Sequence, residues 1–156
     1  MTLRELNDVI GDYSGNSRKV LDYSQIMKRM VDTAKEPGFS AATWAPLAEL
    51  KQMIATEEFE RVGNFKEVMN WESYVGFLAN WAPNAEWECS FKRITERGNV
   101  VFLELEERAS ASGYNTAVNS LSVYEFNDAG KIHHVDIYLQ MELPPAEMLK
   151  SYEGVI

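Results

Sequence analysis

The stretch EWECSFKRITERGNVVFLELEER, residues 86–108, predicts two antiparallel β-strands joined by a tight turn at ERGN. Apolar residues recur at every second position on both sides of the turn, which is the pattern of strands with one buried face. One face carries Trp87, Cys89, Phe91, Val101, Leu103, Leu105 and Glu107. The alternation therefore predicts a sheet with distinct inner and outer faces.

The period of two continues to residue 140. YNTAVNSLSVYEF (residues 114–126) predicts a third strand, NDAG (127–130) a hairpin turn, and KIHHVDIYLQ (131–140) a fourth strand. One face of this last strand carries Ile132, His134, Asp136 and Tyr138, and the other carries His133, Val135, Ile137 and Leu139. Read outward from residue 86, the second half of the chain is a four-strand antiparallel meander.

Helical spacing dominates before residue 86. Helices are expected near residues 2–10, 24–34, 43–54 and 71–81, with a strand over 56–62 and a short C-terminal helix at 146–152. Thr2 and Glu5 fit a capping box for the first helix, and Asn70 is a suitable N-cap for the fourth. This layout predicts an α+β domain over residues 24–156, with helices on one face of a curved sheet and residues 1–23 as an N-terminal helical extension.

Composition excludes several classes of protein. The formal net charge is −9, and no Lys/Arg cluster stands out, which argues against nucleic-acid binding. No apolar run approaches the ~18 residues of a membrane span. The single cysteine, Cys89, cannot form an internal disulfide or a cysteine metal cage, and we expect it to be a small buried apolar residue. We expect a cytoplasmic location.

The order helix, helix, strand, helix and meander, ending in VYEFNDAGKIHHVDIYLQ, resembles the nuclear-transport-factor-two-like superfamily over residues 24–152. The similarity is greatest to its SnoaL-like and limonene-epoxide-hydrolase-like branch. The resemblance implies a cystatin-like α+β barrel: a cone-shaped, curved antiparallel sheet, covered by the N-terminal helices, around a pocket for an apolar small molecule. The superfamily contains isomerases, dehydratases, cyclases and epoxide hydrolases as well as binding and dimerisation modules, so fold alone does not select a function.

The resemblance also implies a set of site residues. Asp136 matches the position of a pocket aspartate after a GKI turn, which places His134 and Tyr138 on the pocket face, and Glu107 falls near a second pocket carboxylate. Leu105 stands where the epoxide hydrolases have an arginine, and Glu60 and Val62 stand where they have tyrosine and asparagine, so the water clamp of that activity is incomplete. Side chains expected to contact the ligand are Trp87, Phe91, Leu105, Ser120 and Arg61, with the choice between Glu60 and Arg61 left open.

The leading hypothesis is a small enzyme that needs no cofactor and no metal. Asp136 would act as general base, with His134 and Tyr138 as acids or orienting groups and Glu107 as a second carboxylate. Val135, Ile137 and Leu139 would then face outward and pack against a second subunit in a homodimer.

Three other readings of the sequence remain. In one, His134, Asp136 and Tyr138 form a solvated face and the apolar face of that strand is the core. The alternative function is a non-catalytic module that holds a ligand or partner in the same cone. In a further reading, residues 2–10 are an interaction arm.

Overall fold

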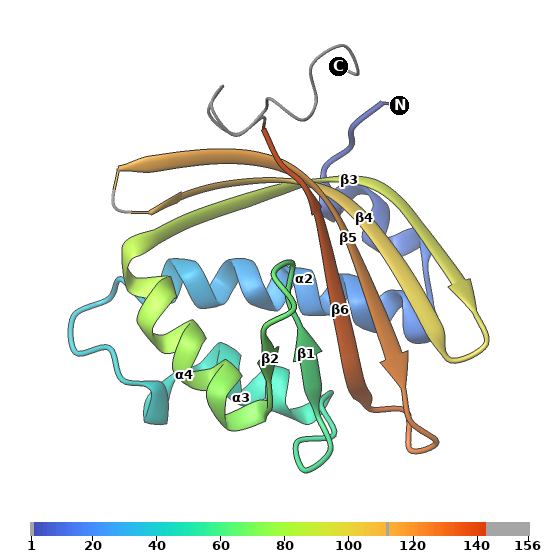
Figure 1. Cartoon of the computed structure of the whole chain (residues 1–156), viewed down its shortest axis with the longest axis horizontal. Helices are drawn as coiled ribbons and strands as arrows, with labels where there is room; N and C mark the ends of the chain where they lie inside the picture. The colour runs from blue at the N-terminus through green and yellow to red at the C-terminus, as the bar shows by residue number, and fades with distance from the viewer. Residues whose placement is uncertain (1, 112, 143–156) are drawn as a thin grey trace.

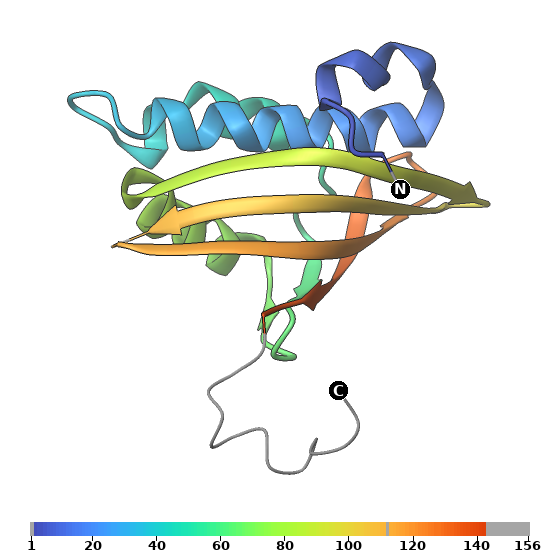
Figure 2. The same ribbon diagram turned by 90° about the horizontal axis from the view of Figure 1, so that it is seen from above.

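A curved six-stranded sheet, in the strand order β2-β1-β6-β5-β4-β3, forms the centre of the structure (Figure 1). The computed structural model describes residues 2–111 and 113–142. The helices are α1 (Leu6–Val9), η1 (Ile10–Asp12), α2 (Gly15–Thr33), η2 (Ala41–Thr43), α3 (Ala45–Gln52), α4 (Trp71–Trp81) and η3 (Ala82–Asn84). The strands are β1 (Glu60–Val62), β2 (Val68–Met69), β3 (Ala85–Arg97), β4 (Val100–Ala111), β5 (Tyr114–Phe126) and β6 (Ile132–Gln140). The long helix α2 runs across one face of the sheet, in contact with β3 and β4 (Figure 2).

The predicted α+β class and the meander are confirmed: β3, β4, β5 and β6 pair antiparallel in chain order. The sheet as a whole is mixed, however, because β1 runs parallel to β6, with Glu60 opposite His134 and Arg61 opposite Val135. The two edge strands, β2 and β3, are not paired with each other, so the curved sheet does not close into a barrel (Figure 1). The parallel pairing brings β1, which comes before the meander, beside its last strand.

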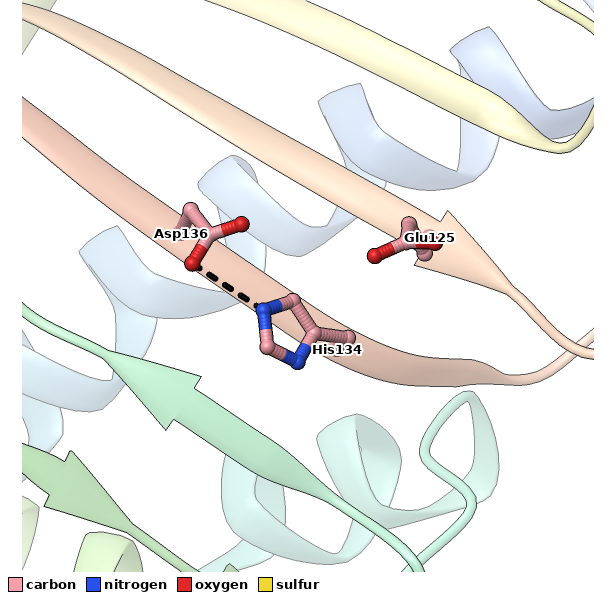
Figure 3. Close-up of side chains that lie close together, drawn as sticks. All are labelled: Glu125, His134 and Asp136. Carbon is pink, nitrogen blue, oxygen red and sulfur yellow. Dashed lines mark hydrogen bonds and ion pairs between the residues drawn. The ribbon is translucent and has the colours of Figure 1, made fainter.

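A β-bulge at the start of β6 decides which side chains face inward. Glu125 is paired with His134 and Phe126 with Ile132, so His133 is an extra residue without a partner on β5. The bulge shifts the alternation, and both Ile132 and Val135 are buried, at 0% and 1% exposure. The polar side chains His134 and Asp136 therefore lie on the outer face, turned away from α2 (Figure 3).

The predicted orientation of β6 is thus wrong, and the reading that makes its apolar face the core is correct. Strict alternation groups Ile132 with His134, whereas the bulge places Ile132 with Val135 and Ile137 on the inner face. Burying these apolar side chains is favourable, at roughly 25 cal/mol per Å² of apolar surface, whereas burying unpaired imidazole and carboxylate groups would be costly.

The N-terminal residues pack into the same core as the rest of the chain. The expected boundary between residues 23 and 24 falls inside α2, and Leu6, Val9 and Ile10 are buried. The first helix begins at Leu6 rather than at residue 2, and no capping side chain is present there. Arg4 instead forms two backbone hydrogen bonds with Phe91 of β3, of 3.1 and 2.7 Å, which hold this segment in an extended conformation.

The fourth helix has the predicted start and end. The Asn70 side chain accepts a hydrogen bond from the Ser73 backbone N–H, the Ser73 hydroxyl accepts one from the Asn70 N–H, and α4 ends before Pro83.

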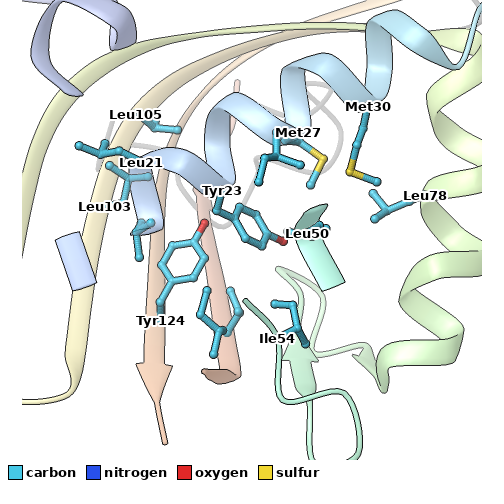
Figure 4. Packing of buried hydrophobic residues seen from close by; sticks show 14 of the residues in the cluster. Leu21, Tyr23, Met27, Met30, Leu50, Ile54, Leu78, Leu103, Leu105 and Tyr124 are labelled. Carbon is cyan, nitrogen blue, oxygen red and sulfur yellow. The ribbon is translucent and has the colours of Figure 1, made fainter. Parts of the chain in front are cut away.

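The hydrophobic core lies between the helices and the inner face of the sheet (Figure 4). It includes Leu21, Met27 and Met30 of α2, Leu50 of α3, Leu78 of α4, and Leu103, Leu105 and Tyr124 of the sheet. This packing is incomplete on one side, and the space that remains forms the candidate site.

None of the helices in the described residues is long and apolar enough to span a membrane. The expected helix at 146–152 lies outside the described residues.

Candidate functional site

A cavity of about 310 Å³ opens between α2, α4 and the inner face of the sheet. Most of its lining is apolar or aromatic, as is usual for small-molecule pockets. The apolar lining includes Met27, Phe77, Leu78, Trp81, Trp87, Leu105, Ile137 and Leu139, and the polar lining includes Tyr23, Ser24, Arg61, Tyr74, Glu107, Ser122 and Tyr124. A second hollow of about 470 Å³, on the other side of Trp87 and Ser24, is lined mainly by polar and charged side chains such as Glu5, Lys28 and Arg108.

Two tyrosine hydroxyls form a buried pair in this cavity. The Oη atoms of Tyr23 on α2 and Tyr74 on α4 lie 2.6 Å apart, a short hydrogen bond, and the residues are 6% and 4% exposed. Burial raises the pKa of Tyr23 well above its ordinary value and also raises the pKa of Tyr74, so both remain neutral phenols. The pair has two hydroxyl protons and uses only one between its members, so the other is available to a ligand oxygen.

Glu107 is the carboxylate of the cavity. The Trp87 indole Nε1–H donates a hydrogen bond to Glu107 Oε1 at 2.8 Å. No described residue donates a hydrogen bond to the other oxygen, Oε2. Since Trp87 is 7% exposed and packed in the core, the indole holds the carboxylate in a defined orientation toward the cavity.

Arg61 enters the cavity from β1, which answers the question left open between Glu60 and Arg61. Its guanidinium carbon lies 5.2 Å from the ring centre of Tyr74 and 5.9 Å from that of Phe77, within cation–π range. Glu60, one residue earlier, lies on the outer face and contacts His134, with Oε1 3.3 Å from Nδ1. Arg61 and Glu107 act on the same hydroxyl in opposite directions: the cation lowers the pKa of Tyr74 and the carboxylate raises it.

The three predicted catalytic residues on β6 do not line this cavity. His134 Nε2 lies 3.0 Å from Asp136 Oδ1 on the outer face, and Tyr138 is 56% exposed there. Glu125 of β5 lies opposite His134 on the same outer face (Figure 3). One carboxylate oxygen each of Glu125 and Asp136 and one ring nitrogen of His134 lie within 4.8 Å of one another. Sequence reasoning missed Glu125 because the strand register, and not the chain order, places it opposite His134.

Because His134 faces outward, the apolar residues of β6 do not form the outer surface predicted for a homodimer contact. Val135, Ile137 and Leu139 were expected to form an apolar outer surface, but they lie on the inner face, where Ile137 and Leu139 line the cavity. The outer face of β6 carries ionisable and aromatic groups instead. A homodimer through this face therefore stays a prediction.

The expected ligand contacts have different positions. Trp87, Leu105 and Arg61 line the cavity. Phe91 is 1% exposed and packs in the core, with its ring centre 6.2 Å from that of Tyr13. Ser120 is buried on the inner face between Leu105 and Leu139, and its Oγ has no hydrogen-bond partner in the described part of the chain.

Cys89 packs against the core but is half-buried rather than fully buried as expected from the sequence. Burial raises the pKa of its thiol to about 12, so the thiolate required of a nucleophile is scarce near neutral pH.

Sequence reasoning missed the tyrosine pair. Tyr23 and Tyr74 each belong to an apolar stripe of a helix, a position typical of ordinary core residues. The helical spacing of Tyr74 with Leu78 and Trp81 predicts the fourth helix, but nothing in the sequence links Tyr74 to Tyr23. The predicted domain boundary after residue 23 also placed Tyr23 in the N-terminal extension.

Several solved structures share this arrangement of sheet and helices. An LEH-like epoxide hydrolase from M. tuberculosis superposes with a TM-score of 0.53 at 14% identity, covering 74% of this chain and 84% of that chain. A SnoaL-like family protein from Agrobacterium tumefaciens, described as a candidate isomerase, gives 0.53 at 14% identity, with 77% and 96% covered. An NTF2-like protein of unknown function from Exiguobacterium gives 0.55 at 12% identity, with 76% and 98% covered.

The chain has the NTF2-like fold. The resemblance seen in the sequence is therefore confirmed at the level of the fold, which this chain shares with a SnoaL-like protein and an LEH-like epoxide hydrolase. No protein-family model matches the sequence, and no curated protein matches it either. The superpositions support the NTF2-like fold, and identities of 12–14% do not extend this similarity to the activity.

Proposed function

We propose that the chain is a small enzyme that performs acid–base chemistry on an apolar carbonyl compound, without a cofactor or metal. The observation that carries this proposal is that Glu107 and the Tyr23–Tyr74 hydroxyl pair line one largely apolar cavity. A carboxylate suits proton abstraction from carbon, and a neutral phenol suits hydrogen bonding to an oxygen that becomes negative.

The proposed reaction is an isomerisation through an enolate. Glu107 removes a proton from the carbon next to a carbonyl group, and the electrons of the C–H bond move to the carbonyl oxygen. The free hydroxyl proton of the tyrosine pair donates a hydrogen bond to that oxygen. Glu107 then returns the proton to another carbon of the same conjugated system, which restores the carbonyl and leaves the carboxylate unchanged.

A non-catalytic ligand-binding module is the alternative, and one observation favours it. Oε1 of Glu107 already accepts the Trp87 indole N–H, which stabilises the carboxylate without any substrate. In this alternative, Glu107 and the tyrosines orient a bound molecule and abstract no proton.

Hydrogen–deuterium exchange at carbon separates the two functions. The wild type is incubated in D₂O with a panel of cyclic ketones and enones, and deuterium at the α-carbon is followed by NMR. Enzyme-catalysed exchange that disappears in Glu107→Gln supports the enzyme. Ligand binding without exchange in any member of the panel supports the binding module.

We also propose a homodimer, with the contact made by the polar and aromatic outer face of β6 in place of the apolar surface expected from the sequence, and a cytoplasmic location. Light scattering tests the first proposal: a mass of one chain across micromolar concentrations would contradict it. Fractionation of cells that express the chain tests the second.

A further inference from the structure

Arg61 is the one cation among the described residues that line the cavity, and Glu107 carries the one carboxylate. The Arg61 side chain is 17% exposed. A guanidinium has five N–H donors, and removing it from water is costly unless those donors meet acceptors. The partners of Arg61 within the protein therefore determine whether its charge and its N–H donors are satisfied without a ligand.

The partners of Arg61 leave part of its charge uncompensated. The aromatic faces of Tyr74 and Phe77 lie against the guanidinium, and the Tyr74 hydroxyl accepts a hydrogen bond from it, but this neutral acceptor does not compensate the positive charge. The nearest carboxylate in the described part of the chain is Glu67, with Oε1 3.9 Å from Arg61 Nη1, beyond normal hydrogen-bond distance. Glu67 is also held elsewhere, because its Oε2 accepts the Phe65 backbone N–H at 2.9 Å.

We infer that the cavity binds a small monocarboxylic acid, with the ligand carboxylate on Arg61 and an apolar body against the aromatic wall. This inference rests on the proposed function, since it places the substrate in the same cavity as Glu107. Arginine and carboxylate groups form paired, charge-assisted hydrogen bonds that would complete the guanidinium.

Among anionic ligands, the charge of the lining favours a monoanion over a dianion. Arg61 and Glu107 together have a formal charge of zero, so a monocarboxylate leaves the occupied cavity with one negative charge. A phosphate or other dianion would give the occupied cavity a net charge of −2, because the single guanidinium would oppose both the dianion and Glu107. The carboxylate class therefore fits better than the phosphate class.

The shape of the wall indicates a planar apolar body. The rings of Phe77 and Trp81 are nearly parallel, with an interplanar angle of 7° and centres 6.3 Å apart, and Leu105 and Leu139 also line the cavity. A volume of about 310 Å³ lies at the small end of ligand pockets, which suits a single ring with a short chain.

Calorimetric titration with 4-phenylbutyrate and with its methyl ester tests the inference, since the two probes share an apolar body and differ in charge. We expect the wild type to bind the carboxylate at least ~10-fold more tightly than the ester. Arg61→Met should weaken carboxylate binding by a similar factor and leave ester binding within about 3-fold. Arg97→Met, an exposed cation at the end of β3, is the matched control and should change neither affinity.

Equal binding of the two probes by the wild type would overturn the inference, as would the absence of binding by both or tighter binding of phenyl phosphate. If Arg61→Met does not fold, the comparison of the two probes on the wild type decides alone. Glu107→Gln separates this inference from the proposed function. It should retain phenylbutyrate binding even where it abolishes exchange, and loss of exchange with unaltered Arg61-dependent binding leaves the inference standing.

Discussion

The hydroxyl oxygens of Tyr23 and Tyr74 lie 2.6 Å apart, although the two residues are 51 positions apart in the chain. One belongs to the long helix α2 and the other to the capped helix α4, and both side chains reach the same cavity. This contact connects the N-terminal helices to the polar centre of the site, so it can be tested for both stability and function.

Removing both hydroxyls of the pair should destabilise the protein by less than the sum of the two single losses. Tyr23→Phe and Tyr74→Phe each leave the partner hydroxyl buried without its hydrogen bond, at a cost of about 1–2 kcal/mol in the free energy of unfolding. The double variant removes the orphaned group, so its loss should be less than the sum of the single losses. Urea denaturation of the four proteins measures this, and additive losses would show that the hydroxyls are not coupled.

Glu107 should be essential for carbon–hydrogen exchange, whereas its neighbour Glu106 should not. Replacing the proposed base by glutamine removes the proton acceptor, with an expected loss of ~10²–10⁴-fold in the exchange rate. Glu106 lies on the outer face beside Arg108, with 2.8 Å between Glu106 Oε1 and Arg108 Nη1, so Glu106→Gln is the matched control.

Asp136→Asn should also leave exchange unchanged, because Asp136 faces outward beside His134. A loss of exchange in Asp136→Asn equal to that of Glu107→Gln would contradict the assignment of the cavity as the site.

The bulge at His133 predicts an asymmetry between two deletions in β6. Deleting His133 removes the extra residue and leaves every other side chain on its present face, so we expect a folded protein within about 3 kcal/mol of the wild type. Deleting Ile137 moves Tyr138 to the inner face and Leu139 to the outer face, which should abolish cooperative unfolding. Circular dichroism melts of both variants test this, and equal damage would contradict the bulge.

Stability should decline at alkaline pH partly through Cys89. Its thiol pKa is raised by burial from 9.0 to about 12, so the folded state keeps the proton that the unfolded chain loses. The contribution is therefore complete below pH 9 and is lost as the pH rises toward 12, with a slope of up to about 1.4 kcal/mol per pH unit. Tyr23, Tyr74 and Tyr124, whose pKa values are also raised, add the same sign above pH 10.

Urea titrations of the wild type and Cys89→Ala between pH 8 and pH 10 isolate the cysteine contribution. The difference in unfolding free energy between the two should shrink as the pH rises. A difference that does not depend on pH would show that the thiol pKa is the same in the folded and unfolded states.

The sequence by itself determined the meander, the α+β class and the fourth helix, because each depends on local chemistry. Alternating apolar residues form strands with two distinct faces, and Asn70 with Ser73 satisfies the first N–H groups of α4 wherever that helix packs. Glu107, Trp87, Leu105 and Arg61 were also expected near the pocket, and the cavity is lined by all four.

The tertiary structure alone decided which face of β6 is inside and what forms the polar centre of the site. A strict period of two treats Ile132 to Leu139 as one regular alternation. In the structure, the pairing of His134 with Glu125 and of Ile132 with Phe126 leaves His133 without a partner, so Ile132 shares the inner face with Val135 instead of sharing a face with His134. Likewise, the parallel pairing of β1 with β6 turns Arg61 inward, and helix packing brings Tyr23 to Tyr74. These outcomes depend on contacts between segments that are distant in the sequence. The free energy gained by burying apolar surface in those contacts outweighs the preference for regular alternation, and it cannot be evaluated from one segment alone.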